Sequence, residues 1–127
     1  MKEIVIASNN QGKINDFKVI FPDYHVIGIS ELIPDFDVEE TGSTFEENAI
    51  LKSEAAAKAL NKTVIADDSG LEVFALNGEP GIYSARYDGE NKSDEANIEK
   101  LLNKLGNTTD RRAQFVCVIS MDRKSVV

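Results

Sequence analysis

The sequence has few of the residues that mark several classes of protein. Its 127 residues include one cysteine, one histidine and no tryptophan. A single cysteine cannot form an internal disulfide, which argues against a small disulfide-stabilised secreted domain. The longest apolar runs are far shorter than the roughly 20 residues of a membrane-spanning helix. The first 20 residues also lack the order of a secretory signal. We therefore expect a cytoplasmic protein with no membrane partner.

Positive charge is also scarce. Fourteen lysines and arginines stand against 22 aspartates and glutamates, which gives a formal net charge of −8. Nucleic acids and anionic membranes are attracted by a positive field, so general binding to either is disfavoured. Any nucleotide ligand must be met by local cations and a metal ion. The hydrophobic content of 42% is ordinary for a globular protein, and the length predicts a single domain over residues 1–127.

Short apolar segments and helical patterns alternate along the chain, which is typical of an α/β fold. We expect strands near residues 4–7, 24–29, 64–68 and 113–121, an extended segment over 71–76, and helices near 14–21, 44–60 and 93–105. The alternating pattern from Ala113 to Met121 predicts a largely buried strand. Cys117 lies in its middle, where a small buried hydrophobe is expected rather than a nucleophile. The only histidine, His25, is assigned no catalytic role.

A polar loop joins the first strand to the first helix. Helix starts carry a partial positive charge, and amides, a glycine and a lysine add donors, so this loop suits a phosphate. It is not a Walker A loop, because Ile14 stands where that motif needs a serine or threonine. The alternative is a helix cap beside a surface lysine. The loop consists of Ser8, Asn9, Asn10, Gln11, Gly12 and Lys13.

Two adjacent carboxylates, Asp67 and Asp68, follow the apolar residues Val64 to Ala66. A turn is expected at Ser69 and Gly70. Ligand and metal chemistry is often placed at the carboxyl ends of strands in open α/β sheets. Paired carboxylates suit Mg²⁺, which takes oxygen ligands. The alternative is an ordinary surface β-turn.

An acidic run from Asp35 to Glu40 precedes the second helix. It is either a solvated loop or a segment that folds over to meet Asp68 and complete a Mg²⁺ site. Thr44 and Glu47 match a capping box, so Glu47 is expected to cap the helix. Lys52 is expected at the surface unless its helix face looks into a cleft.

Four motifs together resemble the Ham1/inosine triphosphatase family of nucleoside triphosphate pyrophosphatases. The resemblance implies an elongated mixed sheet flanked by helices, an active cleft between two lobes and usually a homodimer. It also implies Mg²⁺-dependent hydrolysis of purine nucleoside triphosphates (dITP, ITP and XTP) to the monophosphate and pyrophosphate. The motifs are Ser8 to Lys13, Glu39 to Ala49, Ala66 to Leu71, and Pro80 to Tyr87.

The same resemblance assigns roles to residues of this chain. The loop from Ser8 to Lys13 would bind the substrate phosphates, and Lys52 would face the triphosphate. Glu39 and Asp68 would be metal ligands, with Asp68 also the proton acceptor. Ser69 would touch the substrate. The choice between Glu39 and Glu40 as the metal ligand stays open.

The C-terminal third of the family pattern has no counterpart in this sequence. In the family, that part carries motifs that bind the base and the phosphates of the nucleotide. We therefore expect weak or absent turnover, an unpaired sheet edge, and dimerisation or swapping. The base preference stays open. Two alternatives are a non-catalytic remnant that binds nucleotide or oligomerises, and a Mg²⁺-dependent phosphohydrolase that recognises only phosphates.

Overall fold

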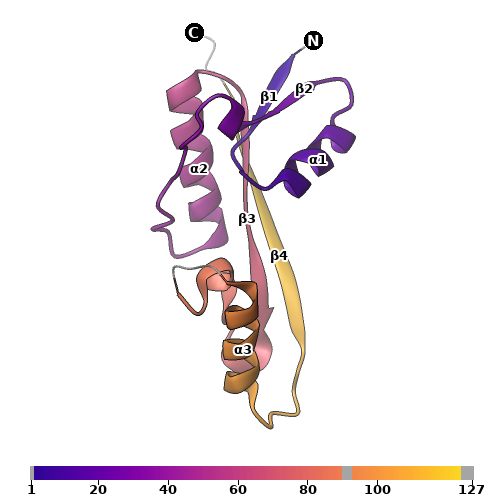
Figure 1. The fold of residues 1–127 in the computed structure, drawn as a ribbon, viewed down its shortest axis with the longest axis vertical. Helices are drawn as coiled ribbons and strands as arrows, with labels where there is room; N and C mark the ends of the chain where they lie inside the picture. The colour runs from indigo at the N-terminus through magenta and orange to yellow at the C-terminus, as the bar shows by residue number, and fades with distance from the viewer. Residues whose placement is uncertain (1, 90–92, 124–127) are drawn as a thin grey trace. The chain divides into compact units, whose positions relative to one another are not determined.

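The computed structural model describes residues 2–89 and 93–123, which form a four-stranded mixed sheet with flanking helices (Figure 1). The strand order is β2-β1-β3-β4, and β1 pairs in parallel with both β2 and β3. This confirms the α/β class and the mixed sheet. The strands are β1 (Glu3–Ile6), β2 (His25–Gly28), β3 (Val64–Val73) and β4 (Ala113–Asp122).

Within the part of the chain that the structure describes, three α-helices and three 3-10 turns connect the strands. The α-helices are α1 (Gln11–Ile20), α2 (Phe45–Leu60) and α3 (Asp94–Leu105). The 3-10 turns are η1 (Ile29–Glu31), η2 (Phe74–Leu76) and η3 (Gly81–Arg86). None of these helices combines the length and hydropathy needed to cross a membrane.

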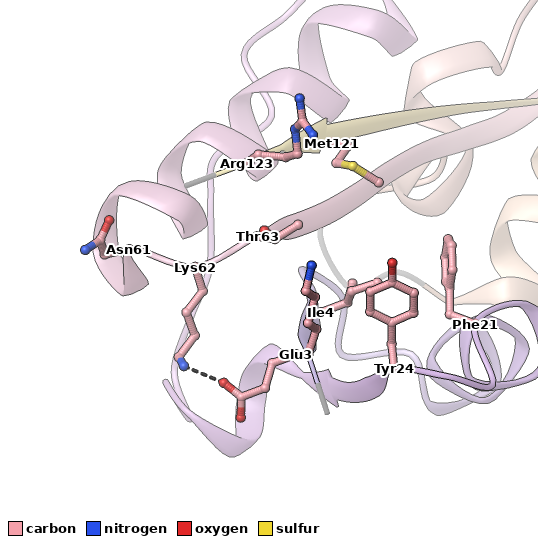
Figure 2. A pocket seen from close by; sticks show the side chains of 10 residues that line it. Glu3, Ile4, Phe21, Tyr24, Asn61, Lys62, Thr63, Met121 and Arg123 are labelled. Carbon is pink, nitrogen blue, oxygen red and sulfur yellow. Dashed lines mark hydrogen bonds and ion pairs between the residues drawn. The ribbon is translucent and has the colours of Figure 1, made fainter. Parts of the chain in front are cut away.

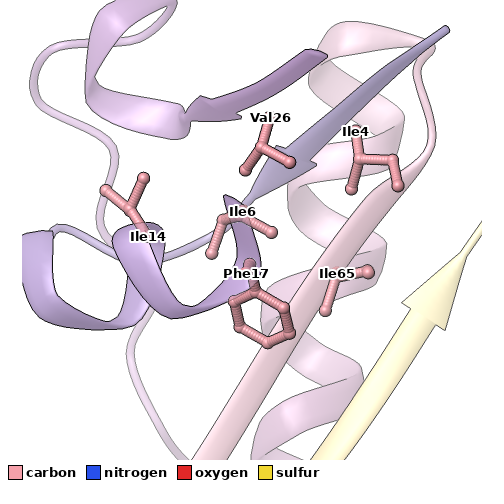
Figure 3. Close-up of a cluster of buried hydrophobic side chains, with 6 residues drawn as sticks. All are labelled: Ile4, Ile6, Ile14, Phe17, Val26 and Ile65. Atoms are coloured by element: carbon pink, nitrogen blue, oxygen red, sulfur yellow. The ribbon is translucent and has the colours of Figure 1, made fainter. Parts of the chain in front are cut away.

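The chain divides into two compact units, of which the first runs up to Asp67 and includes the end of β4 from Val118. Side chains alternate across β1, so one face packs on α1 and the other on α2. The cluster beside α1 is shown in Figure 3. It consists of Ile4, Ile6, Ile14, Phe17, Val26 and Ile65. The cluster on the other face consists of Val5, Ala7, Ile29, Ala56, Val64 and Ala66. These two clusters fix β1 and the start of β3, where the candidate site begins.

The second unit runs from Asp68 to Cys117. Within it, the Phe74 amide donates to the Arg112 carbonyl at 3.1 Å, which joins the end of β3 to the approach of β4. Helix α3 begins after the capping side chain of Ser93 and ends at Gly106, as the sequence predicts. The single domain expected over residues 1–127 stays a prediction.

Strand β4 is much more exposed than its alternating pattern predicts. Phe115 is 70% exposed and Ile119 is 57% exposed, and Cys117 is also exposed, so the expected burial of this strand and of its thiol is wrong. The half-buried face is the other one, where the Ser120 hydroxyl lies 2.8 Å from that of Ser53 on α2. Alternation shows that a strand has two faces, but the segments packed beside it decide which one is covered. β4 is an edge strand of the described sheet, as expected.

Candidate functional site

The loop after β1 is shorter than expected because α1 begins at Gln11. Asn10 caps the helix, since its side-chain oxygen accepts from the Lys13 amide at 3.2 Å. The Ser8 hydroxyl in turn accepts from the Asn10 amide at 3.0 Å. Gly12 and Lys13 therefore lie in the first helical turn rather than in a loop. The Gln11 side chain lies on the helix surface, where it donates to Asn15. Asn9 is exposed.

Lys13 forms an ion pair with Asp67 within the first unit. Its ammonium nitrogen lies 2.8 Å from Asp67 Oδ2, and the side chains are 36% and 7% exposed, respectively. The pair spans 54 positions in sequence and joins the start of α1 to β3. A buried carboxylate requires a compensating partner, and this lysine supplies one. The structure thus brings together the polar helix start and the first member of the acidic pair.

Strand β3 continues through the acidic pair without a turn. Asp67 and Asp68 are only 5% and 6% exposed, and Ser69 and Gly70 are also in the strand. The turn expected after Asp68 is therefore wrong, and so is the alternative of a surface β-turn. Strand β3 is hydrogen-bonded to β4 as its neighbour in the sheet, and the Leu71 amide also donates to the Ser84 hydroxyl at 2.9 Å.

The chemistry of these side chains fits a hard cation, because buried carboxylates offer the oxygen donors that Mg²⁺ prefers. Asp68 and Glu39 are the two carboxylates predicted as metal ligands. Asp68 is buried in β3, whereas Glu39 is exposed in the segment before α2. Within residues 2–89 and 93–123, no group of three or more histidine, cysteine, aspartate or glutamate side chains is arranged to hold a metal ion.

The start of α2 confirms the capping interpretation. The Thr44 hydroxyl accepts from the Glu47 amide at 3.1 Å, and the Glu47 carboxylate accepts from the Ser43 amide at 2.7 Å. In the usual capping box that carboxylate returns to the cap residue itself, whereas here it reaches the residue before. Glu47 thus satisfies backbone donors, as expected.

Lys52 is partly buried rather than a surface lysine. Its ammonium nitrogen lies 3.2 Å from Glu40 Oε1, and the two side chains are 17% and 25% exposed. Glu40 is thus engaged by Lys52. Sequence reasoning did not identify Glu40 or Asp67 as lysine partners. Each acid lies well away from its lysine in sequence, so no local pattern marks either contact.

The motif from Pro80 to Tyr87, which contains two tyrosines and Arg86, makes contacts within the second unit. Tyr87 is buried and its hydroxyl donates to Glu79 at 2.8 Å, while Lys104 donates to the same carboxylate at 2.9 Å. These two donors, Lys104 first, lower the pKa of Glu79. Burial raises the pKa of Tyr87. Arg86 stacks on the Tyr83 ring at 5.3 Å. This motif therefore contributes packing within the second unit.

A separate cavity of about 560 Å³ lies in the first unit at the amino ends of β1 and β3 (Figure 2). Its wall includes Tyr24, Met121 and the ion pair between Lys62 and Glu3, whose nitrogen and oxygen are 2.6 Å apart. None of the residues that line the cavity is one of the predicted site residues, and neither Lys13 nor Asp67 is among them. This cavity is therefore distinct from the candidate site.

The fold and the site define an α/β protein in which a polar helix start meets an acidic strand. The model of the Ham1 family matches residues 4–126, and the chain belongs to this family. It is 99% identical over 121 residues to a dITP/XTP pyrophosphatase of Staphylococcus aureus strain MW2. That match covers 95% of this chain and 62% of the relative.

Solved structures show the same fold. The Staphylococcus aureus Ham1 protein is 98% identical, with a TM-score of 0.89, and the match covers 96% of this chain and 64% of that one. A HAM1 protein from Coxiella burnetii is 43% identical, also with a TM-score of 0.89, and the match covers 98% of this chain and 64% of that one. The chain thus spans somewhat less than two thirds of the length of these relatives.

Proposed function

We propose that this chain carries out Mg²⁺-dependent hydrolysis of the purine nucleoside triphosphates dITP, ITP and XTP to the monophosphate and pyrophosphate. The proposal is supported by membership of the Ham1 family and by relatives named dITP/XTP pyrophosphatase. The structural observation that carries it is the contact between Lys13 and Asp67. This contact joins a helix start suited to phosphate with a strand that supplies buried carboxylates.

The residues from Ser8 to Lys13 would bind the phosphates, together with Lys52. A triphosphate brings dense negative charge into a protein of net charge −8, so these cations and the helix start must offset it. Asp67 and Glu40 hold the two ammonium groups in place before substrate arrives. Because these ion pairs already orient the lysines, the entropy of ordering the two side chains is not lost again when substrate binds.

Glu39 and Asp68 are the proposed Mg²⁺ ligands, because carboxylate oxygens match the preference of this ion. When bound, Mg²⁺ would supply positive charge against the phosphate oxygens. Asp68 would accept the proton of the attacking water, whose oxygen bonds to the α-phosphorus. The bond from that phosphorus to the bridging oxygen then breaks, and pyrophosphate leaves. Ser69 would contact the substrate.

The proposal is tested by measuring pyrophosphate release from ITP, XTP and ATP, each with and without Mg²⁺. Release from ITP and XTP only, only with Mg²⁺, and weaker than that of the longer relative, is the result that supports the proposal. Release from all three would favour a phosphohydrolase that recognises only phosphates. No release, with nucleotide binding retained, would favour a non-catalytic nucleotide-binding or oligomerising protein. The longer Staphylococcus aureus relative is the matched positive control.

We also propose a homodimer, which sedimentation equilibrium would distinguish from a monomer. The proposed substrates belong to the cytoplasmic nucleotide pool, so the protein is expected in the cytoplasm. Fractionation of cells that express the chain would test this location.

A further inference from the structure

Asn48 is a fully buried polar residue in the second turn of α2. Its side chain is 0% exposed, and its Oδ1 accepts a hydrogen bond from the Gly42 amide at 2.8 Å. Burying an amide is costly unless it is hydrogen-bonded, so this contact is expected to persist. It ties the interior of the helix to the backbone of the acidic segment that precedes it.

Gly42 is closely packed against the same part of the helix. A Cβ atom at this position would lie 2.7 Å from Asn48 Oδ1 and 2.7 Å from Glu47 Cβ. Atoms of a side chain do not fit at such distances, so only glycine allows the backbone to come this close. The requirement for glycine comes from the contact with the helix.

A second contact holds the segment further back along the chain. Glu40 reaches Lys52, with 3.2 Å between Oε1 and Nζ. Asn48 and Lys52 are four residues apart and therefore share one helix face. Gly42 thus contacts Asn48, and Glu40 contacts Lys52. The segment from residue 40 to residue 42 therefore lies antiparallel to α2. The adjacent Glu39 carbonyl accepts from the Thr41 amide at 3.1 Å.

We propose that Asn48 and Gly42 act as positioning residues, which we call the Asn48–Gly42 clamp. The clamp holds the acidic segment on α2, with Glu40 against Lys52 and the exposed Glu39 available to a divalent cation. The role of Glu39 rests on the proposed function. Two adjacent glutamates repel one another, and ordering a free loop at the moment of binding is unfavourable. An anchored segment avoids most of that cost.

The test compares two variants of the full chain. Asn48→Ala removes the oxygen that accepts the hydrogen bond of the Gly42 amide. Thr44→Ala is the matched control, because it removes the helix cap and lowers stability but leaves the bond between Asn48 and Gly42 in place. Two quantities are measured by NMR: hydrogen exchange of the Gly42 amide, and the apparent Kd for Mg²⁺ from amide shifts of Glu39.

Loss of one buried hydrogen bond corresponds to a change of about five- to tenfold in an equilibrium. We therefore expect Asn48→Ala to raise both the exchange rate and the Mg²⁺ Kd by about this factor. Thr44→Ala should leave the Mg²⁺ Kd unchanged, because the bond between Asn48 and Gly42 stays in place. The inference is overturned if Gly42 stays equally protected in Asn48→Ala, or if Thr44→Ala raises the Kd as much.

Gly42→Ala changes the other partner of the same contact, because its Cβ would lie too close to Asn48 Oδ1. It replaces Asn48→Ala in the test if that variant does not fold. It should speed exchange of the Thr41 and Ser43 amides and weaken Mg²⁺ binding, whereas unchanged values would count against the clamp. If the original chain binds no Mg²⁺, the proposed metal site is rejected. The exchange comparison then still decides whether the clamp holds the segment, so the two failures are distinguishable.

Discussion

The ion pair between Lys13 and Asp67 leads to a quantitative prediction for Lys13→Met. This change keeps the apolar stem but removes the ammonium group that lies 2.8 Å from a carboxylate that is only 7% exposed. Removing one partner of a fully buried ion pair lowers the free energy of unfolding by roughly 3–5 kcal/mol. A hydrogen bond to a charged group contributes roughly 1.5–3 kcal/mol.

The partial exposure of Lys13 selects the lower of these ranges. Its side chain is 36% exposed, so water reaches the site and screens the remaining carboxylate. We expect Lys13→Met to lower the free energy of unfolding by about 2 kcal/mol. For a chain of this length that corresponds to a fall in Tm of about 6–8 °C.

Urea and thermal unfolding followed by circular dichroism measure this loss. The matched control is Lys18→Met, which removes the same charge from an exposed position on the same helix and should cost less than about 0.5 kcal/mol. In the Asp67→Asn background the cost of Lys13→Met should fall by about 1 kcal/mol, because the buried charge is already gone. Equal losses for the Lys13 and Lys18 variants would refute the reasoning.

Three further predictions concern other parts of the molecule. Asp68→Asn should nearly abolish pyrophosphate release while circular dichroism stays unchanged, and undiminished Mg²⁺-dependent release would defeat the assignment of Asp68. Lys104→Gln should raise the pKa of Glu79 toward its ordinary value, as followed by carbon-13 NMR, since Lys104 is the main cause of its lowering. Because the folded-state pKa is lowered, the stability that this carboxylate contributes is present above its ordinary pKa and is lost as pH falls through the folded-state value. Cys117 should react with a thiol reagent in the folded protein as readily as in denaturant, and strong protection would contradict its exposure.

The helix boundaries could be predicted well where the interactions that define them are local. Thr44 caps α2 with a partner three residues away, and Gly106 ends α3 where the apolar pattern stops. The start of α1 was placed too late because Asn10 itself is the cap, so Gly12 became helical rather than part of a loop. A cap and its partner lie within one turn, so local sequence carries most of this information.

The acidic pair shows where such prediction fails. Asp67 and Asp68, followed by Ser69 and Gly70, have the composition of a turn, yet all four lie within β3. Strand pairing supplied by distant segments outweighs the local preference for a turn. The same reason explains β4, whose alternating pattern did not reveal that Phe115 would be exposed.

The linear order of residues was enough to establish the acidic balance, the alternation of helices and strands, and the motifs by which the Ham1 family is recognised. Folding decided which charges meet: Lys13 with Asp67, and Lys52 with Glu40. It also decided that Asn48 would be buried against Gly42. Helical periodicity and capping depend on neighbours within a few residues. Burial and ion pairing depend instead on which distant segments pack together, and that becomes known only in three dimensions.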